Sequence, residues 1–148
     1  MNDIDVLEIL LVEDNPQDLE LALRALQKSR LSNRIQIARD GTEALEYIFC
    51  EGPHAARKIE QTPKLILLDL KLPKIDGLEV LRRVKGDPRT KSIPVVVLTS
   101  SKEQKDILES YQLGVNSYIV KPVNFESFFT AVGKLGMYWL LLNQPPKI

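Results

Sequence analysis

The chain has 148 residues, a length that fits one domain of ordinary size. Its 44% hydrophobic and 27% charged residues are typical of a globular protein and exclude a disordered or fibrous one. Its 20 Lys and Arg residues balance its 20 Asp and Glu residues, so we expect no nucleic-acid partner. Cys50 and His54 are each the only residue of their kind, which excludes an intramolecular disulfide and a multi-histidine metal site. We expect His54 to lie on the surface of a loop.

The two ends of the sequence carry no membrane signal. The amino-terminal segment MNDIDVLEILLVED has no basic region, and its apolar run is too short for a secretory signal. Leu135–Leu142 is apolar but far shorter than the ~20 residues that span a bilayer. We therefore expect a soluble, cytoplasmic protein with no membrane partner.

Short apolar runs alternate with segments of helical periodicity. Leu7–Val12 predicts a first strand, and Asn15 with Pro16 predicts the N-cap and first turn of a helix. The expected core face of that helix repeats at helical spacing: Leu19, Ala22, Leu23 and Leu26. Ile35 and Ile37 alternate with polar neighbours, which predicts a short second strand.

A capping-box pattern at Asp40-Gly-Thr-Glu43 predicts the start of a second helix, with Leu45, Ile48 and Phe49 on its buried face. Glu51–Lys64, with Gly, two prolines and several charges, predicts a loop with room for one helical turn. Leu65–Leu70 predicts a buried third strand that only Asp69 interrupts. The remaining elements follow in chain order: a turn at Leu72–Gly77, a third helix marked by Leu78, Leu81 and Val84, a fourth strand at Val95–Leu98, a fourth helix at Glu103–Leu113, a fifth strand at Ser117–Val120, and a long last helix capped by Asn124.

This order is (βα)₅ in one domain over residues 1–148, with a core at about 7–135 and an extended last helix and tail at 136–148. Most strands lack polar alternation, so we expect an α/β fold with a parallel sheet covered on both faces. Right-handed crossovers make such a sheet doubly wound. Ligands bind outside the carboxyl ends of its strands.

The informative polar residues fall at strand ends: Glu13 and Asp14 end the first strand, Asp69 lies at the end of the third, Thr99 ends the fourth and Lys121 ends the fifth. Three carboxylates at one edge repel each other unless a cation relieves them, and oxygen ligands in an open site suit Mg²⁺. Lys121 and Thr99 suit the stabilisation of an incoming phosphoryl group. Asp69, the only acid on the middle strand, is the natural nucleophile for an acyl phosphate.

Each of these residues also has an ordinary structural interpretation as a cap, a turn former, a strand residue or a surface charge. Their joint occurrence at matching strand ends is what favours a functional site.

Four segments carry a resemblance: LLVEDN at 10–15, LLDLKLPKIDG at 67–77, PVVVLTSS at 94–101 and SYIVKPV at 117–123. Together they resemble the receiver domain of two-component response regulators over about residues 7–135. The resemblance implies a flavodoxin-like sheet with strand order 2-1-3-4-5. It also implies that a histidine kinase donates a phosphoryl group to Asp69, and that the protein catalyses only its own phosphorylation and dephosphorylation.

The resemblance further implies the roles of the other site residues. Asp14, Asp69 and the backbone carbonyl of Lys71 would bind Mg²⁺, with Glu13 acting through water. The remaining roles are these: Thr99 and Lys121 contact the phosphoryl group, and Tyr118 is an aromatic switch that moves with Thr99. Two departures from the family pattern are Glu13, where Asp is commoner, and the cation of Lys71, for which we hypothesise an effect on phosphoryl lifetime.

The segment after Lys121 has room for a helix and a short tail, so we expect output through protein contacts. The unbroken apolar run Met137–Leu142 cannot be buried on a single helix face. This favours a homodimer through the side of the fourth and fifth strands and the last helix. The loop at Glu51–Lys64 and the proline-containing tail resemble the small response regulators of cyanobacterial and bacterial phytochromes, which implies a light-regulated kinase as partner.

Two other functions stay open at this point. A haloacid-dehalogenase-like phosphatase also uses a nucleophilic Asp after a parallel strand, but it usually carries a second Asp where this chain has Lys71. A receiver-fold binding module that works without phosphorylation is the other alternative, and the complete set of strand-end residues speaks against it.

Overall fold

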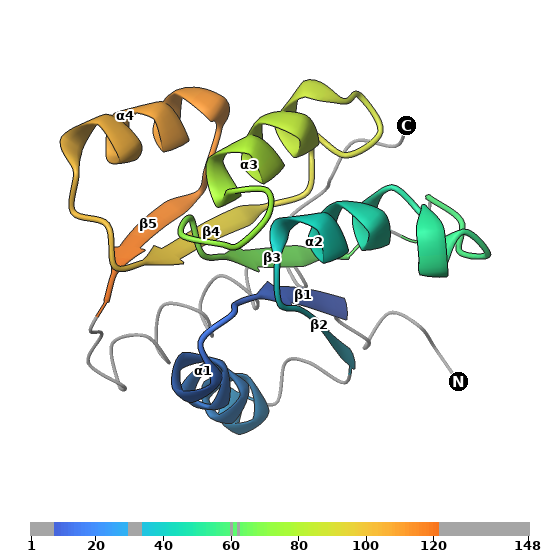
Figure 1. Cartoon of the computed structure of the whole chain (residues 1–148), viewed down its shortest axis with the longest axis horizontal. Helices are drawn as coiled ribbons and strands as arrows, with labels where there is room; N and C mark the ends of the chain where they lie inside the picture. The colour runs from blue at the N-terminus through green and yellow to red at the C-terminus, as the bar shows by residue number, and fades with distance from the viewer. Residues whose placement is uncertain (1–7, 30–33, 60, 62, 122–148) are drawn as a thin grey trace.

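The computed structural model describes residues 8–29, 34–59, 61 and 63–121, and these contain a five-stranded sheet (Figure 1). Its strands are β1 (Glu8–Val12), β2 (Arg34–Ala38), β3 (Leu65–Leu68), β4 (Val95–Thr99) and β5 (Ser117–Val120). They lie in the order β2-β1-β3-β4-β5, and every neighbouring pair is parallel. The predicted doubly wound sheet with order 2-1-3-4-5 is confirmed.

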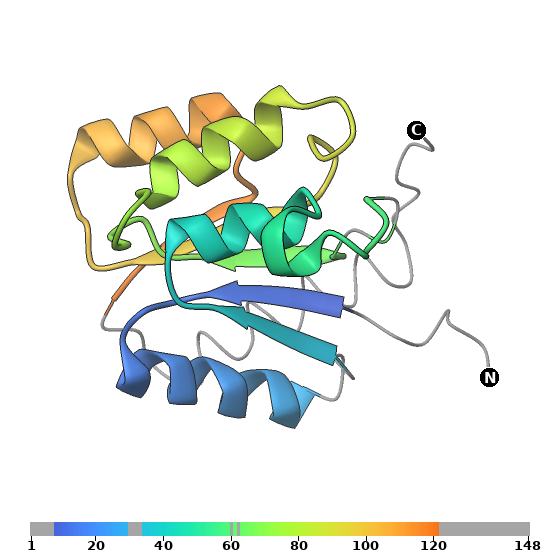
Figure 2. The same ribbon diagram turned by 45° about the vertical axis from the view of Figure 1, so that its right-hand side comes forward.

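Helices cover both faces of the sheet. They are α1 (Pro16–Ser29), α2 (Gly41–Ile48), the 3₁₀ turn η2 (Gly52–His54), α3 (Gly77–Gly86) and α4 (Gln104–Leu113). Figures 1 and 2 show α2, α3 and α4 side by side on one face and α1 on the other. Among the described residues, none of these helices has the length and apolar character that a membrane crossing needs.

Each face of the sheet has its own hydrophobic cluster, because successive side chains of a strand point to opposite faces. On the α1 face, Leu11 and Leu67 pack with Leu26 of the helix. On the other face, Val12 and Leu68 pack with helices α2 and α3. Strands β1, β3 and β4 are buried on both faces, which explains why their sequences show no polar alternation.

Polar caps fix where the helices begin. The side chain of Asn15 accepts hydrogen bonds from the backbone amides of Gln17 and Asp18, each at 3.0 Å, as predicted for an N-cap. Asp40 and Asp76 accept the same kind of bond at the starts of α2 and α3. The starts of these helices all lie just beyond the carboxyl ends of strands, beside the candidate site.

The third strand is shorter than predicted. It ends at Leu68, so Asp69 lies just after the strand, although its amide still donates to the carbonyl of Val12 at 3.1 Å. The carbonyl of Leu70 instead accepts the amide of Gly77 at 2.9 Å, which turns the chain toward α3. The sequence predicted a longer strand because Leu70, although it lies in the turn, is buried and therefore apolar like a strand residue.

The loop after α2 is anchored by Tyr47. The guanidinium of Arg57 lies 3.7 Å from the centre of the Tyr47 ring, and the ring of His54 meets the same tyrosine edge-on at 5.0 Å. His54 lies in the predicted loop and is partly exposed, and its ring is half-buried against Tyr47. The predicted last helix, its cap at Asn124 and the apolar run Met137–Leu142 lie outside the described residues.

Candidate functional site

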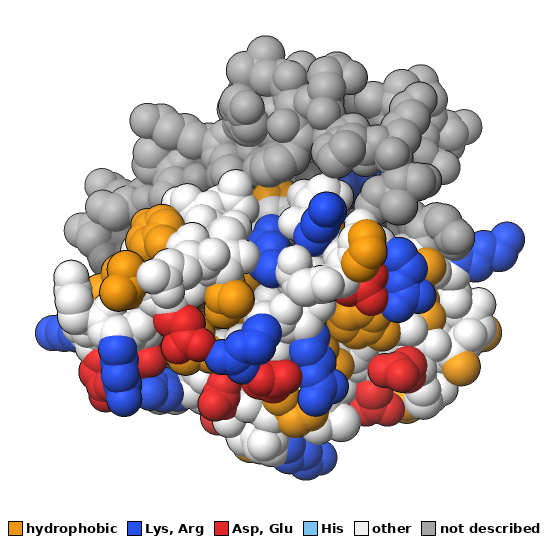
Figure 3. All heavy atoms as spheres, turned by 90° about the horizontal axis from the view of Figure 1, so that it is seen from above, with side chains coloured by type: hydrophobic (Ala, Val, Ile, Leu, Met, Phe, Trp, Pro, Cys, Tyr) orange, Lys and Arg blue, Asp and Glu red, His pale blue; other side chains and the backbone are white. Residues whose placement is uncertain are grey.

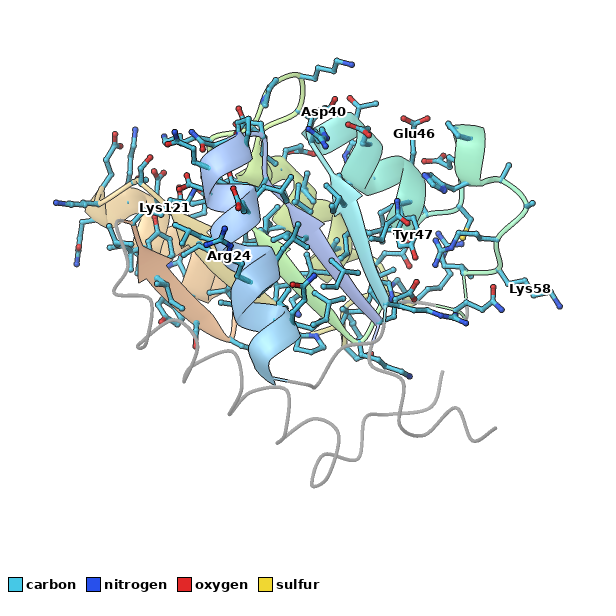
Figure 4. The ribbon with its side chains drawn as sticks, turned by 90° about the horizontal axis from the view of Figure 1, so that it is seen from below. Arg24, Asp40, Glu46, Tyr47, Lys58 and Lys121 are labelled. Carbon is cyan, nitrogen blue, oxygen red and sulfur yellow. The ribbon has the colours of Figure 1, made fainter. Side chains whose placement is uncertain are left out.

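The predicted site residues all lie at one edge of the sheet. Their places are as follows: Glu13 and Asp14 follow β1, Asp69 follows β3, Thr99 is the last residue of β4, and Lys121 follows β5. Parallel pairing brings these carboxyl ends together, because each strand runs in the same direction as its neighbours. Figure 4 shows Lys121 at this edge, between β5 and α1.

The ammonium group of Lys121 is the centre of the site. Its Nζ lies 2.7 Å from Glu13 Oε1, 2.9 Å from Asp18 Oδ2 and 3.1 Å from Asp69 Oδ2. The Lys121 side chain is 13% exposed, while those of Glu13 and Asp69 are 3% and 6% exposed. The lysine thus brings one positive charge among buried carboxylates, which would be costly to bury without a partner.

Burial and the ion pairs of Lys121 shift the pKa values of this cluster. Burial raises the pKa of the Glu13 carboxyl to about 7 from an ordinary value of 4.5, although the hydrogen bond from Lys121 opposes the rise. Burial alone lowers the pKa of the Lys121 ammonium, but its bonds to Glu13 and Asp18, with the charge of Asp69, raise that pKa above its ordinary value. Lys121 therefore stays charged, and Glu13 is the carboxylate whose charge is costly.

Three carboxylates form a cluster that fits a divalent cation. One oxygen from each of Glu13, Asp14 and Asp69 lies within 4.8 Å of the others, and the Asp14 side chain is exposed. All the donors are hard oxygens, and the exposed member leaves room for water, as Mg²⁺ requires. The backbone amide of Lys71 donates to Asp69 Oδ1 at 3.1 Å, while its carbonyl as a metal ligand stays a prediction.

Thr99 and Tyr118 are joined through the loop that follows β4. Thr99 is fully buried, and its Oγ1 accepts the amide of Ser101 at 3.4 Å. The carbonyl of Ser101 accepts the Tyr118 hydroxyl at 3.0 Å. Burial raises the pKa of this hydroxyl, so Tyr118 stays protonated and able to donate. A movement of Thr99 therefore has a direct route to Tyr118.

Ser101 of the loop and Asp106 of α4 extend this contact. Ser101 Oγ donates to Asp106 Oδ2 at 2.5 Å, and Asp106 is buried in the first turn of α4. The ammonium of Lys71 lies 3.6 Å from the same carboxylate oxygen. The Lys71 side chain thus connects the segment after Asp69 to α4.

Comparison with known proteins decides the family. The family model for the response regulator receiver domain matches residues 9–133. The chain belongs to the response regulator receiver family. This receiver is 43% identical over 149 residues to the probable methanogenesis regulatory protein FilR2 of Methanothrix harundinacea, covering 96% of this chain and 93% of that protein. It is 42% identical over 132 residues to the response regulator Rcp1 of Synechocystis sp., covering 89% and 88% of the two chains.

Solved structures agree with this assignment. The phosphorylated cyanobacterial phytochrome response regulator RcpA matches the receiver with a TM-score of 0.82 and 44% identity, covering 96% of this chain and 99% of that one. The Mn²⁺-bound form of Rcp1 matches with a TM-score of 0.78 and 39% identity, covering 95% and 99%. The chain is a receiver of a two-component phosphorelay, homologous to phytochrome response regulators, and the phosphatase alternative is not favoured.

Sequence reasoning missed one acidic residue of the receiver's site and two residues beside it, one in the loop after β4 and one in α4: Asp18, Ser101 and Asp106. Asp18 is the third carboxylate on Lys121. A weak signal existed, because Asp18 stands four residues after Asp14 in the first turn of a helix, where an acid favours the helix dipole. Nothing in the sequence indicated that this acid would turn toward the end of β5.

Proposed function

We propose that Asp69 accepts a phosphoryl group from the phosphohistidine of a histidine kinase. A carboxylate oxygen of Asp69 attacks phosphorus, the bond from phosphorus to the imidazole nitrogen breaks, and its electron pair stays on the imidazole. The product is an aspartyl phosphate. The observation that carries the proposal is the position of Asp69, buried at a strand end, in an acidic cluster and 3.1 Å from the charged Lys121.

Mg²⁺ is the cation that we propose for the cluster, held by Asp14, Asp69 and the carbonyl of Lys71, with Glu13 acting through water. When bound, it supplies positive charge to the phosphoryl oxygens and relieves the repulsion among the carboxylates. The clustering of the three carboxylate oxygens within 4.8 Å of one another supports this assignment, as does the Mn²⁺-bound structure of the homologue Rcp1.

Two further side chains act on the transferred group. Lys121 neutralises charge on a phosphoryl oxygen, and the hydroxyl of Thr99 donates to another. Thr99 then leaves its bond with the amide of Ser101, and Tyr118 follows because its hydroxyl is bonded to the carbonyl of the same residue. This step converts phosphorylation into a change of the surface at β4, α4 and β5.

Phosphorylation by a small phosphodonor tests the acceptor. The full chain is incubated with Mg²⁺ and acetyl phosphate, and its intact mass is measured beside that of Asp69→Asn. We expect the wild type to gain the mass of one phosphoryl group. We expect no gain in Asp69→Asn, and none when a chelator is present during the incubation. A chain that gains no mass under any of these conditions would instead support a binding module that works without phosphorylation.

The kinase that we propose is of the phytochrome type. Homology to Rcp1 and to the phytochrome response regulator RcpA supports this choice, whereas the relative FilR2 is a probable methanogenesis regulatory protein. Phosphotransfer from a purified phytochrome kinase, measured in red light and after far-red light, tests it. We expect transfer that follows the light-dependent phosphorylation of the kinase. Transfer no faster than from an unrelated histidine kinase would contradict the assignment.

Output through a homodimer is also part of the proposal. Leu108 and Tyr111 of α4 are 59% and 51% exposed and stand one helical turn apart. Figure 3 shows hydrophobic side chains in separate patches across the face that α2, α3 and α4 form, some of them on the α4 side. Sedimentation at micromolar concentration, with and without beryllofluoride as a phosphoryl mimic, tests this assembly. A monomer in both states would refute it.

A further inference from the structure

Asp18 stands apart from the other acids of the site, because it comes from α1 and not from the end of a strand. We infer that Asp18 is a positioning residue: it keeps the ammonium of Lys121 directed at the acceptor Asp69 while the other carboxylates change partners. This inference rests on the function proposed above and assigns a residue to it that the strand-end pattern does not contain.

The ammonium of Lys121 has three protons and three carboxylate partners. A lysine ammonium offers three donors and no acceptor, so the oxygens of Glu13, Asp18 and Asp69 satisfy it completely. These are charge-assisted hydrogen bonds, which are stronger than neutral ones. The direction of the Lys121 side chain is thus set by three points of attachment.

Two of these partners have a second task. Asp69 is the phosphoryl acceptor in the proposed function, and Glu13 belongs with Asp14 to the carboxylate cluster that fits a cation. Each must weaken its bond with Lys121 when the cation and the phosphoryl group arrive. Asp18 is not a member of that cluster, so nothing in the proposed reaction draws it away.

The backbone of Asp18 is fixed independently of Lys121. Its amide donates to the side chain of the N-cap residue Asn15 at 3.0 Å, and the next residue, Leu19, is buried in the core under α1. The negative charge also lies in the first turn of the helix, which the helix dipole favours. Within the ranges that the structure describes, Lys121 is the ion-pair partner of Asp18.

A second acid on the same helix provides a matched control. Glu20 pairs with Arg24 at 2.7 Å one turn along α1, and both side chains are about two-thirds exposed (64% and 66%). The labelled Arg24 in Figure 4 lies along α1 and apart from Lys121. Glu20→Gln therefore removes the same charge from the same helix without touching the ammonium.

Loss of Asp18 would leave Lys121 held only by the two carboxylates that the reaction needs. Both would then have to give up tighter bonds with the lysine, and the ammonium would lose the one partner that persists through phosphorylation. We expect the rate of phosphorylation of Asp18→Asn, by acetyl phosphate at saturating Mg²⁺, to fall about tenfold, as for the loss of one bond to a charged group. Asp18→Glu restores the charge and should recover part of that rate.

The test uses the full chain and four variants: Asp18→Asn, Asp18→Glu, Glu20→Gln and Asp69→Asn. Intact mass gives the phosphorylation rate, and ¹⁹F NMR of the beryllofluoride complex reports on the fluorine that faces the ammonium. We expect Asp18→Asn to slow phosphorylation and shift that fluorine signal, with Glu20→Gln like the wild type. Thermal unfolding checks that each variant is folded. If Asp18→Asn does not fold, Asp18→Glu replaces it in the comparison with the wild type and Glu20→Gln.

The results separate the two claims. A wild type that takes up no phosphoryl group, or an Asp69→Asn variant that does, overturns the proposed function. A wild-type rate and fluorine spectrum in folded Asp18→Asn, or an equal loss in Glu20→Gln, overturns the positioning role and leaves the acceptor assignment intact.

Discussion

Gly77 offers a sharp test of how the acceptor is held. It is the first residue of α3, and a Cβ added there would lie 2.2 Å from the carbonyl oxygen of Asp69 and 2.5 Å from the Cα of Leu70. Real Cβ atoms essentially never come closer than 3.0 Å, so Gly77→Ala must displace the helix start or the acceptor segment by at least about 0.8 Å. Both neighbours are backbone atoms, so no side chain can rotate away to make room.

The expected cost follows from two opposing terms. Overpacking of this kind costs about 1–3 kcal/mol, while alanine in a helix recovers at most about 1 kcal/mol over glycine. We therefore expect Gly77→Ala to lower the free energy of unfolding in urea by about 1–2 kcal/mol. Because the displaced backbone belongs to Asp69, we also expect phosphorylation by acetyl phosphate to slow by roughly tenfold or more.

Gly86 at the other end of α3 is the control, since a Cβ there would meet no atom within 4 Å. Gly86→Ala should leave the phosphorylation rate unchanged and alter stability by at most about 1 kcal/mol, in the stabilising direction. The reasoning is refuted if Gly77→Ala unfolds within about 0.5 kcal/mol of the wild type and is phosphorylated at the same rate.

Three further predictions concern charges and hydrogen bonds of the site. Burial raises the pKa of Glu13 from 4.5 to about 7, so in the absence of a divalent cation the free energy of unfolding should fall as pH rises through that window. Glu13→Gln should remove this loss and stabilise the fold at pH 8 by about 1–3 kcal/mol in urea unfolding. A variant with the same pH profile as the wild type would contradict this. Lys71→Ala should alter the dephosphorylation rate, because the side chain pairs with Asp106, whereas the exposed Lys102→Ala should not; equal rates in all three proteins would end the idea. Tyr118→Phe should leave phosphorylation unchanged but weaken the beryllofluoride-induced shifts in the NMR spectrum of α4, and full-size shifts would refute its coupling role.

Much of the fold could be predicted because local and global patterns agree. The fully apolar strands indicate burial on both faces, and parallel direction alone then places Asp69 and Lys121 at the same edge. The cap at Asn15 was visible because its effect is local to four residues. What could be predicted thus depended on strand direction and on short-range hydrogen bonding.

The residues that were missed depend on tertiary geometry. Whether Asp18 reaches Lys121 is set by the rotation of α1 about its axis, which comes from packing of the helix against the sheet. The bond from Ser101 to Asp106 forms because the loop after β4 folds back onto the start of α4. The end of β3 at Leu68 was also hidden, because buried turn residues are as apolar as strand residues.

The claim that Asp69 stores the phosphoryl group is tested most directly by locating that group on the chain. Borohydride reduces an aspartyl phosphate to homoserine, so the phosphorylated protein can be trapped, digested and sequenced by tandem mass spectrometry. The account predicts homoserine at position 69 in the sample treated with phosphodonor and Mg²⁺, and none in the sample treated with chelator. Reduction at Glu13, Asp14 or Asp18 instead of Asp69 would contradict it.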